Sequence, residues 1–234
     1  MSRMNDHFDT PPYGRGLHSS GFVLMSHPGP YSFWIFSAYT PEYASVVHAH
    51  LLPSLRARLA QPNFVRYSVQ PIASKGSWVL NCGSKATAIL VYWRQSYESV
   101  LWVDADAEVV GDLSPLNDLV GAFDVCVLRR DHAMRQRWPL VNSSCLSGTI
   151  LFSNVRPFLV EKLLMRWAQR VEEKPTDLDQ DVLGEVLSEF ERDHGLRVGQ
   201  LPPEFVCIPD LMPDVRGAIV HRQASRRMRD SIGN

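Results

Sequence analysis

The chain has 234 residues, 45% of them hydrophobic, which is enough apolar material to build the core of one large domain. Its formal net charge is -1 and its pI is about 6.7, so no overall positive field favours nucleic acid or an anionic membrane. No segment approaches the roughly 18 apolar residues of a membrane span, and the first residues lack the pattern of a secretion signal.

Strands and helices alternate in the first half of the chain. Residues 1–30 carry repeated prolines and glycines, which predict an irregular N-terminal arm. Hydrophobic periodicity then predicts a strand at 31–40, a helix at 42–59 preceded by Pro41, a strand at 63–72, a helix at 84–97 and a strand at 99–104. This β-α-β-α-β order predicts a mainly parallel sheet.

The second half adds shorter elements and two long helices. The pattern predicts a short helix at 113–120, strands at 123–128 and 147–154, and helices at 156–173 and 177–195. Gly195 closes the last helix, and the final forty residues return to short strands and loops. We therefore expect one α/β domain over 31–234, with a nucleotide-binding part at about 31–128 and an acceptor and sugar part at about 129–234.

Two aspartates end the apolar strand in the segment LWVDADAEVV. Asp104 and Asp106 lie where ligands bind in open α/β sheets, and residues two apart on an extended segment point to one side. Carboxylates held so close repel one another, whereas a divalent cation converts that repulsion into binding. Oxygen ligands of this kind suit Mg²⁺ or Mn²⁺. The pattern predicts a metal site, and the alternative is a solvated turn in which one aspartate caps the next segment.

The segment around this pair resembles the metal-binding DxD strand of glycosyltransferases with the A-type nucleotide-diphospho-sugar transferase fold, especially the glycogenin-like and related branches. Further matches follow in order over roughly residues 33–227. SKATAILVYWRQSY resembles the family's Lys-bearing helix, SGTILFSN its N/S-G-x-x-x-F-N strand, DLDQDVL its D-Q-x-x-L helix start, and IVHRQASRR its metal-binding His with basic residues after it. The resemblance implies a single Rossmann-like domain with a mainly parallel central sheet flanked by helices.

The resemblance also implies a function and a set of site residues. A metal-dependent enzyme would move a sugar from a nucleotide-diphospho-sugar, with a UDP-sugar the best match, to a hydroxyl acceptor. The implied metal ligands are Asp104, Asp106 and His221. The implied donor-binding residues are Tyr39, Thr40, Lys85, Asp104, Gly148, Arg226 and Arg227, and the implied catalytic segment is Asp179, Gln180 and Asp181. Glycogenin-like relatives retain the anomeric configuration, so retention is the expected outcome, although no general base is identified.

Most of these residues also have a structural interpretation. An aromatic side chain such as Tyr39 at a strand end commonly belongs to the core, and Lys85 has the alternative of being an ordinary exposed lysine. Gly148 can mark a bulge, and Asp179 can favour the start of a helix electrostatically. The basic residues after His221 can equally form a solvated tail.

A cluster of arginines follows the strand at 123–128. In LRRDHAMRQRW these residues are Arg129, Arg130, Arg135 and Arg137. They predict a binding surface for a phosphorylated or polyanionic acceptor, for which DNA with hydroxymethylated bases, as in phages, is one candidate. The alternative is a set of surface arginines paired with Asp131 and other acids.

Two other functions start from similar motifs. Haloacid-dehalogenase-like phosphatases use a DxD nucleophile, but they place it near the start of the domain and have Thr or Val where this chain has Glu108. A non-catalytic module that binds sugar nucleotides is the third alternative. The four cysteines form no CxxC pair and lie mostly among apolar neighbours, which predicts reduced thiols and a cytoplasmic protein, in the host cytoplasm if the source is viral.

Overall fold

A six-stranded sheet forms the centre of the computed structural model, which describes residues 32–59, 66–137 and 143–222. Its strands are, in spatial order, β2 (Tyr67–Pro71), β1 (Trp34–Tyr39), β3 (Val100–Val103), β6 (Cys145–Phe152), β5 (Val125–Arg129) and β7 (Val198–Gln200). The pairs β1–β2, β1–β3 and β5–β7 are parallel, and β6 runs opposite to its neighbours β3 and β5. The prediction of a mainly parallel sheet is therefore confirmed.

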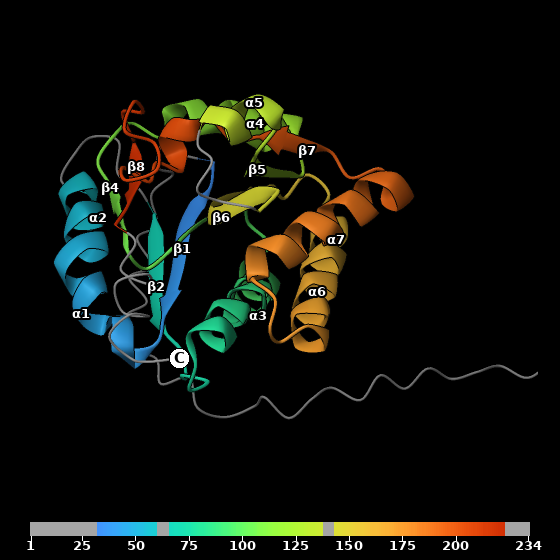
Figure 1. The fold of residues 1–234 in the computed structure, drawn as a ribbon, viewed down its shortest axis with the longest axis horizontal. Coiled ribbons are helices and arrows are strands. Elements are labelled where there is room, and N and C mark those ends of the chain that lie inside the picture. The colour runs from blue at the N-terminus through green and yellow to red at the C-terminus, as the bar shows by residue number, and fades with distance from the viewer. Residues whose placement is uncertain (1–31, 60–65, 138–142, 223–234) are drawn as a thin grey trace, which may run out of the picture.

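Helices cover both faces of this sheet (Figure 1). One face carries α3 (Trp78–Ser96), α6 (Pro157–Glu173) and α7 (Asp179–His194), and the other carries α1 (Ala44–Val46), a π-helical turn (Val47–Leu51), α2 (Leu52–Leu59) and α4 (Asn117–Ala122). Alternate residues of β3 supply the two cores, with Val100 and Trp102 facing one and Leu101 and Val103 the other. Burial on both faces explains the continuously apolar sequence of this strand.

The long helix α3 begins six residues earlier than the periodicity predicts. Ser77 caps it, because its Oγ accepts a hydrogen bond of 3.3 Å from the backbone N–H of Leu80. The helix ends where Tyr97 takes a left-handed conformation with φ 49°. The two extra turns bring the residues around Cys82 to the carboxyl edge of the sheet, where the candidate site lies.

A second, two-stranded sheet lies beside the carboxyl end of β3. The antiparallel strands β4 (Ala107–Val109) and β8 (Ile219–His221) form it, with Ala107 opposite His221. The sequence predicted no strand at β4, because three residues are too few for a periodic signal. This pairing carries the C-terminal part of the chain to the two aspartates.

Short elements complete the description. They are the 3₁₀ turns at Pro41–Tyr43, Ser114–Leu116 and Pro203–Phe205 and the helix α5 (His132–Arg137). As predicted, Gly195 ends α7 in a left-handed conformation, and the four cysteines are free thiols. The predicted N-terminal arm, Arg226 and Arg227 lie outside the described residues. Within the described part of the chain, no helix has the length and apolar character that crossing a membrane requires.

Candidate functional site

The side chains of Asp104, Asp106 and His221 converge at the carboxyl end of β3. Each offers one ligand atom, and these atoms lie within 4.8 Å of one another. Asp104 and Asp106 lie on a turn, closed by a 3.1 Å hydrogen bond from Ala107 N–H to the Asp104 carbonyl, so the expected extended geometry is wrong although the carboxylates do converge. His221 arrives from β8 through its pairing with Ala107.

Both ends of the His221 imidazole have defined neighbours. Nε2 lies 3.0 Å from the hydroxyl of the buried Thr149, whereas Nδ1 faces Asp106, 3.8 Å from its Oδ1. A neutral ring that donates from Nε2 to Thr149 leaves the Nδ1 lone pair directed at the carboxylates. The ring also lies against Gly148, where an added Cβ would stand 2.9 Å from its Cε1. Sequence analysis missed Thr149, whose signal is a polar residue inside a buried strand.

This set of donors suits a hard divalent cation. Two carboxylate oxygens and one imidazole nitrogen bind Mn²⁺ or Mg²⁺ and leave further positions for a ligand. Burial raises the pKa of Asp104, and the neighbouring charge of Asp106 raises it further, while Lys85 acts in the opposite direction. A cation bound here would remove the repulsion between the two carboxylates.

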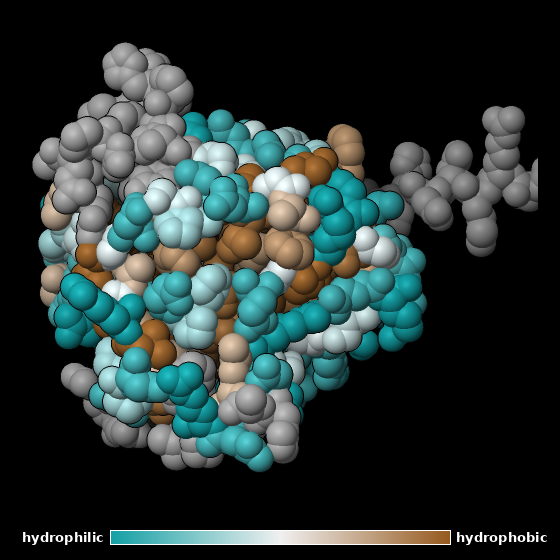
Figure 2. All heavy atoms as spheres, turned by 90° about the horizontal axis from the view of Figure 1, so that it is seen from above, coloured by the Kyte–Doolittle hydropathy of each residue, from teal (hydrophilic) through white to brown (hydrophobic). Residues whose placement is uncertain are grey.

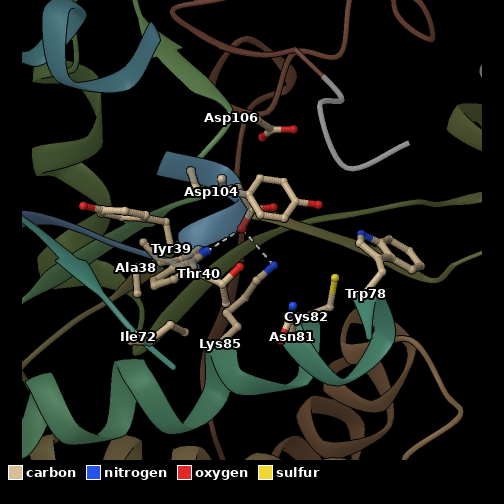
Figure 3. A pocket seen from close by; sticks show the side chains of 13 residues that line it. Ala38, Tyr39, Thr40, Ile72, Trp78, Asn81, Cys82, Lys85, Asp104 and Asp106 are labelled. Atoms are coloured by element: carbon tan, nitrogen blue, oxygen red, sulfur yellow. Dashed lines mark hydrogen bonds and ion pairs between the residues drawn. The ribbon is translucent and has the colours of Figure 1, made fainter. Parts of the chain in front are cut away.

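Lys85 connects this cluster to the start of α7. Its ammonium Nζ lies 2.9 Å from Asp104 Oδ1 and 3.1 Å from Asp179 Oδ2, and it donates to the Ser147 carbonyl and hydroxyl (Figure 3). Burial by itself lowers the pKa of Lys85, but the carboxylates of Asp104 and Asp179 raise it above its usual value. Lys85 is only 8% exposed, so the alternative of an ordinary surface lysine is wrong.

The start of α7 contributes two of its three predicted residues to the site. Asp179 is buried and accepts a 3.0 Å hydrogen bond from the Ser147 hydroxyl in addition to its ion pair with Lys85. Gln180 lines the same hollow and donates through Nε2 to Ser143. Asp181 does not line that hollow or the pocket beside it.

A pocket of about 110 Å³ lies between the end of β1 and the first turns of α3. Tyr39 and Thr40 line it, as predicted, together with Trp78 and Asn81 from α3 (Figure 3). Sequence analysis missed Trp78 and Tyr43, because an aromatic residue at a helix start cannot be told from a core residue by its pattern. Burial raises the pKa of the Tyr43 hydroxyl to about 12, so it remains a hydrogen-bond donor.

A second hollow of about 170 Å³ lies on the other side of the carboxylates. It includes Ser147, Gly148 and Gln180, and it shares Lys85 and Asp104 with the aromatic pocket. Together the two spaces form a continuous groove with the candidate metal ligands at its middle. The groove therefore offers an aromatic end, a polyvalent centre and a polar end.

The four predicted arginines fall into two groups. Arg129 forms a bidentate ion pair with Glu191 at 2.6 and 2.9 Å, and Arg137 pairs with Asp214. For these two residues the alternative of pairing with surface acids describes the structure. Arg130 and Arg135 line a separate hollow beyond β5.

The comparisons with known proteins show the fold. No protein-family model and no curated protein matches the chain. Among solved structures, a glycosyltransferase involved in the glycosylation of the major capsid of PBCV-1 matches at TM-score 0.60 and 18% identity, over 85% of this chain and 97% of that one. GlyE of Streptococcus pneumoniae TIGR4 matches at TM-score 0.53 and 13% identity, over 82% of this chain and 54% of that one.

WbbM, a bifunctional glycosyltransferase, matches at TM-score 0.51 and 14% identity, over 83% of this chain and 46% of its own. Identities this low describe architecture alone, and they leave the glycogenin-like branch as a resemblance. The α/β fold of this chain is the fold of these glycosyltransferases, and its Asp-x-Asp cluster lies at the carboxyl edge of its sheet.

Proposed function

We propose that the protein is a metal-dependent glycosyltransferase that moves a sugar from a nucleotide-diphospho-sugar to a hydroxyl acceptor. The observation that carries the proposal is the cluster of Asp104, Asp106 and His221 in the middle of a groove with an aromatic end. Glycosyltransferases with the same architecture support it. The cation is Mn²⁺ or Mg²⁺, as the oxygen-rich ligand set favours.

The groove suggests how the donor lies. The nucleoside, most simply the uridine of a UDP-sugar, occupies the pocket at Tyr39, Thr40 and Trp78, where the aromatic side chains offer stacking surfaces. The diphosphate lies at the metal ligands, and the first turns of α3 direct their backbone N–H groups toward this region. The sugar enters the hollow beside Gly148, Asp179 and Gln180. Arg226 and Arg227 follow β8 and are proposed to contact the diphosphate.

During transfer, the bond between the sugar C1 and the diphosphate oxygen breaks, and the acceptor oxygen bonds to C1 and loses its proton. A bound divalent cation supplies stabilisation of the negative charge that develops on the departing nucleoside diphosphate. Lys85 holds Asp104 and Asp179 in fixed positions on either side of C1. Because Asp179 is ion-paired, it is a poor proton acceptor, which leaves it the role of orienting the sugar. Retention of configuration stays a proposal from the family resemblance.

The rival functions have weaker support. A haloacid-dehalogenase-like phosphatase would have its nucleophilic aspartate after the first strand of the domain, whereas Asp104 follows β3, and Asp104 is already paired with Lys85 and Trp102. A binding module without catalysis would not need Asp179 and Gln180 beside the metal ligands. We also propose that the protein acts in a reducing cytoplasm, because its four cysteines are free.

A division near residue 128 follows from the same geometry. The aromatic pocket is built entirely from residues 38–106, and most of the residues that line the polar hollow come from 146–221. We therefore propose a nucleotide-binding part before about residue 128 and an acceptor and sugar part after it, within one domain.

A donor screen tests the proposed function. UDP-, GDP-, ADP- and CDP-linked sugars are each added with Mn²⁺, with Mg²⁺ or with a chelator, and the melting temperature of the protein is measured. We expect stabilisation by one donor, a UDP-sugar, only when metal is present, because ligand that binds the native state raises its stability. Absence of stabilisation by every donor, in a folded protein, would contradict the proposal.

A further inference from the structure

A second hollow with a distinct charge lies at the carboxyl end of β5. Arg129, the last residue of this strand, is paired with Cys145, the first residue of β6. The hollow extends from this point to α5 and α7, and we call it the arginine hollow; its argued members are Arg130, Asp131, Arg135, Ser144, Gly184 and Ser188. It lies at the same edge of the sheet as the metal ligands.

Two guanidinium groups come together in the arginine hollow. Arg135 donates from Nε to the carbonyl of Arg130 at 3.0 Å, which fixes the position of its guanidinium. Arg130 is 3% exposed, and burial and the charge of Arg135 lower its pKa. Among the residues that line the hollow, Asp131 is the acid, and its carboxylate accepts the Met134 N–H at the start of α5. Two cations therefore face one anion, which favours a further anion as the ligand.

The remaining wall offers hydroxyl groups and close packing. Ser144 and Ser188 present their side chains there, and both are exposed. A Cβ on Gly184 would overlap the Ser144 hydroxyl, so glycine at this position keeps the hollow open. Guanidinium forks and hydroxyl donors match the oxygens of a phosphoryl group.

The arginine hollow adjoins the donor groove along α7. Gln180 lines the groove and Gly184 lines the hollow, and four residues of helix separate them by about 6 Å. The Cys145 thiol donates to the Gln180 carbonyl at 3.2 Å, so one wall serves both spaces. An acceptor sugar near Gln180 can therefore place a substituent in the hollow.

We propose that the arginine hollow binds a phosphoryl group carried by the acceptor, an inference that rests on the proposed glycosyl transfer. A single phosphoryl group on a small acceptor fits better than a track of nucleic-acid phosphates, because Arg129 and Arg137 are neutralised by Glu191 and Asp214. The face above α4 and α5 also carries an apolar band among its hydrophilic residues, whereas an extended polyanion needs a continuous hydrophilic surface (Figure 2).

The first test uses inorganic phosphate as the probe, titrated calorimetrically in chelator into the wild type, Arg135→Gln and Arg137→Gln. Arg135 and Arg137 are both exposed on α5, but Arg135 alone of the two lines the hollow. We expect Arg135→Gln to weaken phosphate binding about tenfold or more, as loss of a charge-assisted hydrogen bond does, and Arg137→Gln to bind like the wild type. Absent phosphate binding, or equal binding by all three proteins, would overturn the inference.

The second test uses transfer with Mn²⁺ and the donor from the screen. Acceptor sugars that differ only in a phosphoryl group are compared with a short single-stranded oligonucleotide. We expect the phosphorylated sugar to be preferred through a lower KM, and Arg135→Gln to lose that preference with kcat unchanged. Preference for the plain sugar or for the oligonucleotide would overturn the inference. The phosphate titration needs neither donor nor metal, so failure of the proposed function would appear separately, as absent donor binding.

Discussion

Two buried clusters of opposite charges lie at opposite edges of the central sheet. At the amino edge, Asp124 is fully buried and receives hydrogen bonds from Arg156 and from the side chain and backbone N–H of Arg197. At the carboxyl edge, Lys85 lies between Asp104 and Asp179, and all three line the groove. The first cluster satisfies its own groups and joins β5 to neighbouring segments, whereas the second faces a space. We infer that the first serves stability and the second serves ligand binding.

The largest expected effect comes from a metal ligand at the carboxyl edge. Asp106→Asn keeps the size of the side chain but removes a carboxylate from the cation, so metal-dependent binding of the nucleoside diphosphate should be abolished while the fold persists. Calorimetric titration of UDP with Mn²⁺ measures this loss, and circular dichroism checks the fold. Asp118→Asn, an exposed residue on α4, is the control and should bind like the wild type. Undiminished binding by Asp106→Asn would remove the functional distinction between the two edges.

The next prediction concerns the amino edge. Asp124→Asn leaves two guanidinium groups without their buried carboxylate, so the free energy of unfolding should fall by about 3 kcal/mol. Affinity for the donor should not change. Denaturation with urea measures the first quantity and calorimetry the second. A loss of donor affinity without a loss of stability would reverse the assignment of the two clusters.

The same pair of proteins gives a pH dependence. Hydrogen bonds from Arg156 and Arg197 lower the pKa of Asp124 well below its usual range despite its burial. The stability that ionised Asp124 contributes is therefore fully present above the unfolded-state pKa of about 3.9 and is lost as pH falls toward the lower folded-state value. We expect the difference in unfolding free energy between wild type and Asp124→Asn to be constant near neutral pH and to shrink below about pH 4. A difference that grows on acidification would contradict this account.

A smaller effect is expected behind the metal ligands. Gly148→Ala would place a Cβ 2.9 Å from His221 Cε1, which must displace the imidazole. Mn²⁺ affinity should fall by about tenfold to a hundredfold, as it does when the support of a ligand is disturbed. Gly121→Ala is the matched control, because no atom lies within 4 Å of its added Cβ. Equal Mn²⁺ affinity in both variants would show that His221 is not held by this contact.

The smallest effect is expected at Thr149. Thr149→Val keeps the shape of the side chain but removes the hydroxyl that hydrogen-bonds to His221 Nε2. The imidazole then lacks the partner that favours a free Nδ1, and Mn²⁺ affinity should fall about tenfold. Competition with a fluorescent metal indicator measures this change. Unchanged affinity would indicate that the ring is oriented by packing against Gly148 alone.

Local patterns in the sequence predicted the elements whose signal is long. The apolar run of β3, the helices α6 and α7 and the pair of aspartates all lie where periodicity and motif placed them. The three-residue strands β4 and β8 were too short to predict, so their pairing, which brings His221 to Asp106, was available only from the family resemblance.

Burial and partnership were harder to predict than position. Lys85 was correctly placed on a helix ahead of the aspartates, but its burial between two carboxylates depends on segments far apart in the chain. Tyr43, Trp78 and Thr149 were missed because each is an ordinary residue in its local pattern. The arginines appeared as one cluster in the sequence, and only the structure separates the two that pair with Glu191 and Asp214 from the two in the arginine hollow.

The central claim is that Asp104, Asp106 and His221 together bind the cation that holds a nucleoside diphosphate. Electron spin-echo spectroscopy of Mn²⁺ bound with UDP tests it most directly, because a coordinated imidazole nitrogen couples to the electron spin of the metal. The account predicts ¹⁴N coupling in the wild type and its loss in His221→Gln. Bound Mn²⁺ without that coupling, or coupling that survives in His221→Gln, would contradict it.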